Sequence, residues 1–275
     1  MLNKGFEGWY FKHQCPADTV AFIPGRAESG AFLQVLSKSC SRRFDLPEIP
    51  VENGVILAGG CTFSKAGCRI DLPGISGEIR YQNLTELRSD IMGPFRHFPM
   101  QCRHGVLSMA HDLDGMLTFD GRNIDFRGGT GYAETDRGVS FPRSYLWFQC
   151  NDFPEPCSIM LSVAHIPFGP ASFTGCICAI VHGGREYRLA TYRGVRIRSS
   201  APAHIVLSQG KLRLEAEITP LDTGYALSSP LQGKMTGTIR ESHQAAVHCR
   251  LWEDGQLLFD LHSRRASFEY VPEKG

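Results

Sequence analysis

Short runs of alternating apolar and polar residues constrain the fold of this 275-residue chain more than any other feature. Residues 211–218 (KLRLEAEI) alternate strictly, which is typical of a strand with one buried face. Residues 174–182 and 186–193 flank Gly183 and Gly184, and this arrangement predicts a β-hairpin. Long stripes with the helical period are absent, and residues 84–92 are the best helix candidate. The pattern therefore predicts an all-β protein of antiparallel strands.

No linker rich in serine and glycine divides the chain, so the domain boundary is inferred from the order of the predicted strands. Gly128 and Gly129 follow a series of predicted hairpins. We therefore expect one β-barrel or sandwich over residues 1–128 and a second over residues 129–275. The aromatic runs at 6–12 (FEGWYFK) and 144–150 (SYLWFQC) resemble each other slightly and predict a degenerate internal repeat.

Charge and cysteine content exclude several classes of protein. The formal net charge is +1, without the clustered basic excess of a surface that binds nucleic acid. No apolar run approaches the ~20 residues that a membrane-spanning helix needs, and the first residues lack the apolar centre of a secretion signal. We therefore expect a cytoplasmic protein that does not bind nucleic acid and whose ten cysteines are reduced and mostly buried.

Histidines and cysteines are not spaced as metal ligands in this sequence. No C-x-x-C pair is present, and His97, His104 and His111 recur every seven residues, which puts successive members on opposite faces of a strand. We therefore expect no metal site among them. His104 is then either a structural histidine or a single acid–base group in a pocket.

Residues 131–142 (GYAETDRGVSFP) hold the most informative polar pattern. Tyr132, Glu134 and Asp136 alternate, so a strand would present all three side chains on one face. Two neighbouring carboxylates repel each other, which does not help a solvent-facing strand but suits a pocket that needs an acid. Their repulsion separates the two apparent pKa values and leaves one carboxyl protonated. Glu134 and Asp136 are therefore candidates for a catalytic acid.

The N-terminal run FEGWYFK places another carboxylate among aromatic side chains. Glu7 and Trp9 share one face of the predicted strand, and Tyr10 and Lys12 share the other. Burial against apolar groups would raise the pKa of Glu7 and make it a proton donor near neutral pH. The alternative is a structural role, in which Glu7 pairs with an arginine or a backbone group.

The run at 144–150 has one mixed face and one apolar face. Tyr145, Trp147 and Gln149 share the mixed face. In a barrel that holds a ligand such a face lines the cavity, and otherwise it is an ordinary solvent face. We favour the cavity, because tryptophan and tyrosine exposed side by side are uncommon.

Five segments together resemble the tocopherol cyclase family. They are residues 6–12, 102–109 (CRHGVLSM), 131–151 (GYAETDRGVSFPRSYLWFQCN), 173–180 (FTGCICAI) and 239–252 (IRESHQAAVHCRLW). The segment at 131–151 is the most specific. The resemblance implies two lipocalin-like (calycin-type) β units with a ligand site between or within them. Because the chain starts at the first motif, without a plastid transit extension, it resembles a bacterial-type member.

The resemblance also implies an activity, the acid-catalysed cyclisation of a prenylated hydroquinone to a chromanol by an isomerase without cofactor or metal. An acid protonates an alkene of the prenyl tail, and aromatic faces hold the cation until the phenol oxygen closes the ring. Glu134 or Asp136 would donate the proton, and His104 or Glu7 would receive the phenolic proton. The expected substrate contacts are Trp9, Tyr10, Tyr132, Tyr145, Trp147 and Gln149.

Other functions fit the same pattern. A related isoprenoid hydratase would let water trap the cation, and a lipocalin-like carrier would bind a hydrophobic ligand without reaction. A carrier needs apolar walls with no ionisable pair at their centre, so Glu134 and Asp136 separate these hypotheses. A glycan-binding β-sandwich would instead show an open groove. A hydrophobic small molecule is the expected partner, and such a substrate is consistent with peripheral contact with a membrane.

Overall fold

The computed structural model describes residues 5–168, 171–201 and 203–273. Their regular structure consists of β-strands and two short 3-10 helices, η1 (Gly93–His97) and η2 (Thr191–Arg193). The all-β prediction is confirmed, and the helix candidate at residues 84–92 is irregular. Within the described ranges, no helix is long and apolar enough to cross a membrane.

Two compact units make up the chain. Unit 1 comprises Met1–Leu87, His104–Ser140 and Ser228–Gly237, and unit 2 comprises Arg88–Arg103, Phe141–Leu227 and Thr238–Gly275. The predicted boundary at 128/129 falls inside unit 1. The reason is that strand β12 (Gly129–Gly138) pairs antiparallel with the N-terminal strand β1 (Phe6–Gln14), from Phe6 opposite Gly138 to Gln14 opposite Thr130. The polar strand thus completes the first sheet instead of opening the second.

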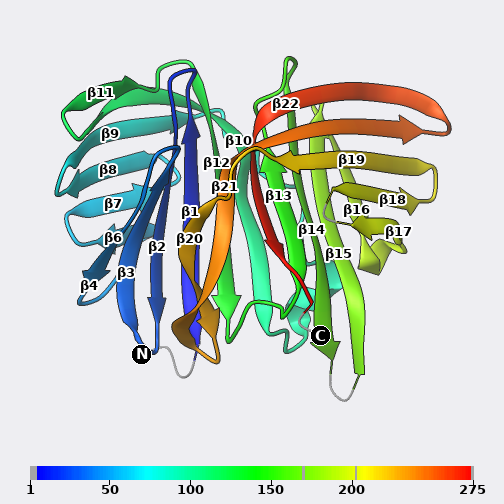
Figure 1. The fold of residues 1–275 in the computed structure, drawn as a ribbon, viewed down its shortest axis with the longest axis horizontal. Coiled ribbons are helices and arrows are strands. Elements are labelled where there is room, and N and C mark those ends of the chain that lie inside the picture. The colour runs from blue at the N-terminus through cyan, green and yellow to red at the C-terminus, as the bar shows by residue number, and fades with distance from the viewer. Residues whose placement is uncertain (1–4, 169–170, 202, 274–275) are drawn as a thin grey trace. The chain divides into compact units, whose positions relative to one another are not determined.

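A 12-stranded antiparallel sheet forms unit 1, in the order β4-β3-β2-β1-β12-β10-β9-β8-β7-β6-β5, with β11 beside β10 (Figure 1). Its remaining strands are β2 (Thr19–Ala27), β3 (Gly30–Ser37), β4 (Ser41–Leu46), β5 (Val51–Glu52), β6 (Val55–Ala58), β7 (Cys61–Ser64), β8 (Gly67–Leu72), β9 (Ile75–Gln82), β10 (Cys102–Phe119) and β11 (Arg122–Asp125). Phe22 of β2 and Phe63 of β7 lie far apart in this order, yet their ring centroids are 6.0 Å apart. The sheet therefore folds over a single apolar core.

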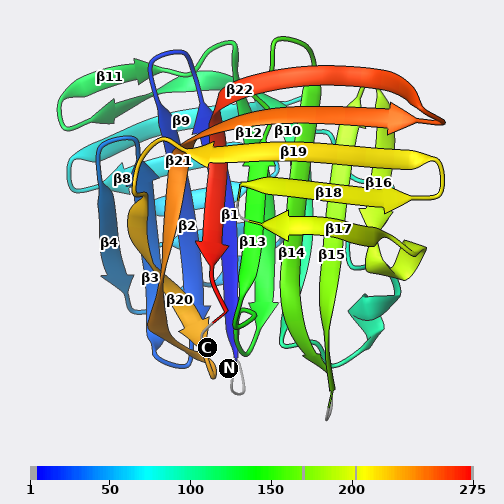
Figure 2. The same cartoon turned by 45° about the vertical axis from the view of Figure 1, so that its right-hand side comes forward.

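A 10-stranded antiparallel sheet runs mainly through unit 2, in the order β16-β15-β14-β13-β22-β21-β19-β18-β17, with β20 beside β21 (Figure 2). The end of β20 and the start of β21 fall in unit 1. Its strands are β13 (Tyr145–Cys150), β14 (Cys157–Phe168), β15 (Ala171–His182), β16 (Arg185–Ala190), β17 (Arg196–Ala201), β18 (His204–Gln209), β19 (Leu212–Pro220), β20 (Tyr225–Leu231), β21 (Lys234–Glu253) and β22 (Gln256–Val271). Its core draws on strands at or near both ends of the sheet, from Leu189 of β16 to Leu207 of β18.

Tight turns join neighbouring strands where the sequence places glycine. Gly183 and Gly184 have φ angles of 57° and 72° and connect β15 to β16, as the predicted hairpin requires. Asp254 and Gly255, with φ angles of 53° and 80°, connect β21 to β22 in the same way. These left-handed conformations favour glycine, because it has no Cβ to clash with the backbone.

The two aromatic runs occupy equivalent places in their sheets. β1 lies between β2 and β12, with β10 next beyond β12, and β13 lies between β14 and β22, with β21 next beyond β22. The predicted internal repeat therefore appears in strand order, although the two sequences share little.

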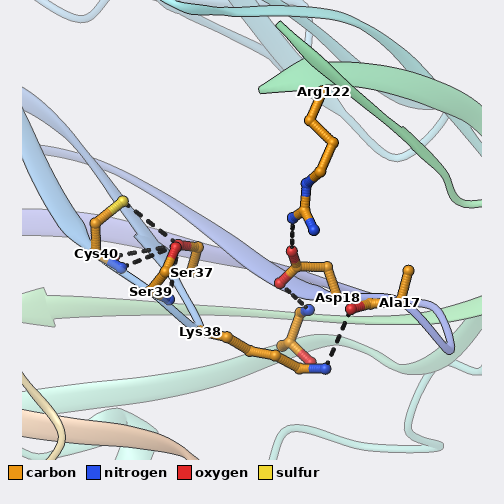
Figure 3. Close-up of polar contacts among 8 residues, drawn as sticks. Ala17, Asp18, Ser37, Lys38, Ser39, Cys40 and Arg122 are labelled. Carbon is orange, nitrogen blue, oxygen red and sulfur yellow. Dashed lines mark hydrogen bonds and ion pairs between the residues drawn. The ribbon is translucent and has the colours of Figure 1, made fainter. Parts of the chain in front are cut away.

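Polar contacts hold the turn after β1 against neighbouring segments of unit 1 (Figure 3). Arg122 of β11 forms an ion pair with Asp18 in this turn. Asp18 Oδ1 accepts the backbone N–H of Thr19 at 2.8 Å, and the Lys38 ammonium donates to the Ala17 carbonyl at 3.4 Å. The turn is thereby joined to β11 and to the β3–β4 connection, which fixes one end of β1.

Candidate active site

A buried polar face lies on the side of β1 and β12 opposite to the core of unit 1. Ala133 of β12 and Phe11 of β1 face the core, so Tyr132 and Glu134 project to the other side. The register places Tyr10 opposite Glu134 and Lys12 opposite Tyr132. These four side chains are buried although they do not belong to the apolar core. Burial on this face therefore places these side chains in surroundings of low polarity, which shift the pKa values of acids and bases.

His104 lies between the two candidate carboxylates. It comes from β10, the strand next to β12. Its Nε2 is 3.3 Å from Glu134 Oε2, and its Nδ1 is 3.0 Å from Asp136 Oδ1. The Tyr132 hydroxyl donates to the same Glu134 Oε2 at 2.5 Å. We call these four residues, Tyr132, His104, Glu134 and Asp136, the His104 cluster.

Electrostatic effects hold protons on the cluster. Burial lowers the pKa of His104, but the attraction of Glu134 and then of Asp136 outweighs it and raises that pKa well above its usual value. Burial raises the pKa of Glu134, against the opposing attraction of His104. Burial and the neighbouring Glu134 charge also raise the pKa of Tyr132 well above its usual value, so its hydroxyl stays a donor. The arrangement can therefore keep an acidic proton away from water near neutral pH.

Aromatic rings adjoin this acid. The rings of Tyr10 and Tyr132 meet edge to face, with centroids 6.4 Å apart. Lys12, which is fully buried beside them, was missed as a site residue. The signal that could have found it is its parity with Tyr10 in the run FEGWYFK, since residues two apart share a face.

Glu7 and Trp9 lie on the other face of β1, and the structure does not bring them to the His104 cluster. Arg26 of β2 donates from Nη2 and Nε to Glu7 Oε2, at 2.7 and 3.1 Å. The Arg26 guanidinium also lies 5.6 Å from the centroid of the Trp9 ring, and Trp9 packs in the core. This arrangement matches the structural alternative for Glu7, an arginine pair on the first strand.

Tyr145, Trp147 and Gln149 lie together in unit 2, on the face of β13 opposite to its core. All three are buried. Trp147 pairs in register with Glu269 of β22, and the Tyr145 hydroxyl donates to Glu269 Oε2 at 2.6 Å. The mixed face predicted from the sequence is thus a buried one.

A second carboxylate–histidine pair continues this face of unit 2. Glu241 of β21 pairs in register with Glu269, and Glu241 Oε1 is 2.8 Å from His243 Nε2. Both side chains are buried. Sequence reasoning missed Glu241 and Glu269, because only the pairing of β13, β22 and β21 brings them beside Trp147.

One imidazole and two carboxylates of the His104 cluster also form a donor set for a divalent cation. One ligand atom from each of His104, Glu134 and Asp136 lies within 4.8 Å of the other two. Spacing along the sequence concealed this set, because it combines residues from two different strands.

Comparison with known proteins identifies the family. The family model "Tocopherol cyclase-like" matches residues 77–270, more than half of the chain. A probable chloroplastic tocopherol cyclase of Oryza sativa subsp. japonica is 26% identical over 203 residues, which cover 68% of this chain and 43% of that relative. The chain therefore spans less than half the length of this curated relative.

Solved structures show the same fold. CghA, solved with Sch210972, superposes with a TM-score of 0.66 at 10% identity, over 99% of this chain and 90% of that one. Kievitone hydratase of Nectria haematococca superposes with a TM-score of 0.60 at 11% identity, over 98% and 90%. The likeness to these structures over nearly the whole chain agrees with the lipocalin-like fold that the resemblance to the tocopherol cyclase family implied. By the match of its sequence to the family model, this chain belongs to the tocopherol cyclase-like family.

Proposed function

We propose that this chain is an isomerase that cyclises a prenylated hydroquinone, or a related isoprenoid, to a chromanol, with the His104 cluster as the source of the proton. The observation that supports it best is the position of Glu134. This carboxyl is buried, its pKa is raised, and the Tyr132 hydroxyl and the His104 imidazole both contact it. A dry carboxylic acid is the group that alkene protonation requires.

Glu134 Oε1 is the atom that we assign as the proton donor. In the described residues, both polar contacts of this carboxyl end on Oε2, from Tyr132 and from His104. Oε1 therefore carries the proton and transfers it to the less substituted carbon of a trisubstituted alkene. A tertiary carbocation forms, and the phenol oxygen of the same substrate bonds to it. The phenolic proton then returns to Glu134, so no atom is gained or lost.

His104 and Asp136 make the transfer easier by stabilising the carboxylate that it leaves behind. A protonated His104 beside Glu134 attracts that carboxylate, and the hydroxyl of Tyr132 bonds to it. Asp136, at 3.0 Å from His104 Nδ1, keeps the imidazole charged and oriented. General acid catalysis of this kind contributes roughly 10²–10⁴-fold to a rate.

Aromatic faces would stabilise the cation during ring closure. Tyr10 and Tyr132 lie at the His104 cluster and supply such faces in unit 1. Tyr145, Trp147 and Gln149 of unit 2 remain proposed substrate contacts, supported by their shared, buried, mixed face. Trp9 packs in the core of unit 1, which favours a structural role for it.

The hydratase and carrier alternatives would use the same buried face, but they predict a different outcome for the substrate. A hydratase would use the same acid and deliver water to the cation, which adds the mass of water to the substrate. A carrier would bind the ligand unchanged, and it has no need of a buried carboxyl with a raised pKa. The His104 cluster therefore favours a reaction over transport.

Turnover of a defined substrate tests the proposal. We would incubate the purified chain with a phytyl- or geranylgeranyl-benzoquinol and follow the products by chromatography and mass spectrometry. The expected result is a chromanol of unchanged mass, formed by the wild type and lost in Glu134→Gln. Glu7→Gln is the matched control, because Glu7 lies on the opposite face of β1, and it should retain turnover. Undiminished turnover in the double variant Glu134→Gln, Asp136→Asn would refute the acid assignment.

A further inference from the structure

Three potential metal ligands converge on the outer face of the β21–β22 hairpin in unit 2. His248 of β21 and His262 of β22 are direct partners in the register of the two strands. Asp260 precedes His262 by two residues on β22, so it shares the same face. The intervening residues, Cys249 and Leu261, face the core. The three polar side chains therefore project away from the core, beside the strand β19 that Figure 2 shows next to β21.

Their ligand atoms already lie close to the spacing of a bound ion. His248 Nε2 is 2.6 Å from Asp260 Oδ1, and His262 Nε2 is 3.7 Å from the same oxygen. The two imidazole rings stack with centroids 3.8 Å apart and an interplanar angle of 20°. Around a tetrahedral Zn²⁺ with bonds of about 2.0–2.1 Å, neighbouring ligand atoms lie about 3.3 Å apart. The remaining pair of ligand atoms, on His248 and His262, lies within 4.8 Å. Shifts of up to ~1.5 Å, together with rotation of the two stacked rings, would give the tetrahedral spacing.

The surrounding charges favour a cation. Arg250, the register partner of Asp260, forms ion pairs with Glu217 at 2.8 Å and with Glu215 at 3.2 Å. Its positive charge is thereby compensated. Glu217 is also the register partner of His248, which adds a carboxylate to the same row of residues. The side chains of His262 and Asp260 are 69% and 45% exposed, so an ion in solution reaches them directly.

We propose that His248, Asp260 and His262 form a binding site for a divalent ion of the zinc class. Two imidazoles and one carboxylate are ligands that Zn²⁺ and Cu²⁺ accept readily, whereas Ca²⁺ and Mg²⁺ prefer oxygen alone. The ion replaces the proton that now joins His248 to Asp260, and water completes its coordination. Bound there, it links β21 to β22, the strands that carry Glu241 and Glu269.

The alternative is a hydrogen-bonded pair with no affinity for metal, and unit 2 offers a matched example. His182 Nε2 lies 2.9 Å from Glu155 Oε1, and among the residues that the structure describes no second histidine joins this pair. His182→Ala is therefore the control variant. It removes the same kind of contact from the same unit while leaving the proposed site intact.

Calorimetric titration of the tag-free 275-residue chain with ZnCl₂, after removal of metals with EDTA, tests the proposal. One saturable site is expected in the wild type and in His182→Ala. His262→Ala and Asp260→Asn should each weaken binding by roughly tenfold or more, and the double variant His248→Ala, His262→Ala should abolish it. Zn²⁺ should also raise the melting temperature of the wild type but not of the double variant. Circular dichroism confirms that each variant is folded.

Two outcomes would overturn the proposal. One is an unchanged isotherm in His248→Ala, His262→Ala, because the site would then lie elsewhere. The other is zinc binding that disappears in Asp136→Asn and persists in His262→Ala, because the ion would then occupy the His104 cluster, the other three-ligand group among the described residues. Neither outcome depends on turnover, so this test stands apart from that of the proposed function.

Discussion

The hydroxyl of Tyr132 donates to Glu134 Oε2 at 2.5 Å, and the two residues are nearest neighbours on one face of β12. This contact opposes the effect of burial on Glu134, because a donor stabilises the charged form of a carboxyl. The Tyr132 contact, made within a single strand, thus adds to the stronger opposing attraction of His104 from the neighbouring strand β10.

Tyr132→Phe should weaken the acid without removing it. Hydrogen bonds to charged groups contribute about 1.5–3 kcal/mol, so turnover should fall roughly 10- to 150-fold. The pKa of Glu134 should rise further, because its carboxylate loses a donor. Steady-state kinetics across pH would show both effects. Tyr270→Phe, at an exposed position, is the control, and an equal loss of activity in both variants would contradict the assignment.

The protonation of His104 can be followed without substrate. Its pKa should lie well above that of an exposed histidine, and Asp136→Asn should lower it, because one of the two attracting carboxylates is removed. The measurement is a pH titration of the histidine ring signals by NMR, with assignment through His104→Gln. An unchanged titration in Asp136→Asn would show that this carboxylate does not hold the imidazolium.

Turnover should decline on the alkaline side. The reactive form needs a protonated Glu134, whose pKa is raised in the folded protein. As pH rises through that value the proton is lost, and the rate falls with it. A profile of kcat/KM against pH for the free enzyme would show this single limb. A rate that increases steadily from pH 6 to pH 9 would argue against a carboxylic acid donor.

Mild acid should destabilise unit 1 through two buried histidines. Burial, with the charge of His111, lowers the pKa of His13 to about 3, and burial lowers that of His111 to about 4. In the unfolded chain both titrate near 6.5, so their contribution to stability is present above that pH and is lost as pH falls from there towards the folded values. Between pH 7 and pH 5 each of these two histidines should lower the free energy of unfolding by about 2 kcal/mol.

Urea unfolding at the two pH values measures this loss. In His13→Gln the difference in the free energy of unfolding between pH 7 and pH 5 should shrink by about 2 kcal/mol. His97→Gln, at an exposed position, is the control. A difference that is equal in the wild type and in His13→Gln would contradict the prediction.

Gly131→Ala should disturb the strand that carries the acid. A Cβ at this position would lie 2.2 Å from His111 Nε2, a buried ring that packs against Tyr81 with centroids 4.4 Å apart. Overpacking of this kind costs about 1–3 kcal/mol, which denaturant unfolding resolves. The double variant Gly131→Ala, His111→Ala removes the clash, so its loss should be smaller than the sum of the two single losses.

Local patterns in the sequence predict many of the strands and turns of this fold, but not which distant strands pair with each other. The alternation at 211–218 becomes β19, and glycines 183 and 184 form the predicted turn, because both depend on near neighbours. The shared face of Tyr132, Glu134 and Asp136 has the same origin. The boundary at 128/129 depended instead on which distant strand β12 would pair with, and no local rule decides that.

The composition of the candidate site was partly hidden for the same reason. Glu134 and Asp136 were visible as a pair, but the position of His104 between them follows from β10 lying beside β12. Glu269 had no local signal either, because it meets Tyr145 only through the pairing of β13 with β22. Side chains that belong to different strands become neighbours only when the register is known.

The pairing of β1 with β12 has a consequence for synthesis on the ribosome. β1 is translated before β12, its partner on one side, which ends at Gly138. At about 5–20 residues per second, roughly 6 to 25 s separate the end of β1 at Gln14 from the end of β12 at Gly138. During that interval the nascent chain carries an aromatic strand with one unpaired edge, which is prone to bind other chains or a chaperone. Slow codons before β12 should therefore lower the yield of folded protein more than slow codons after it.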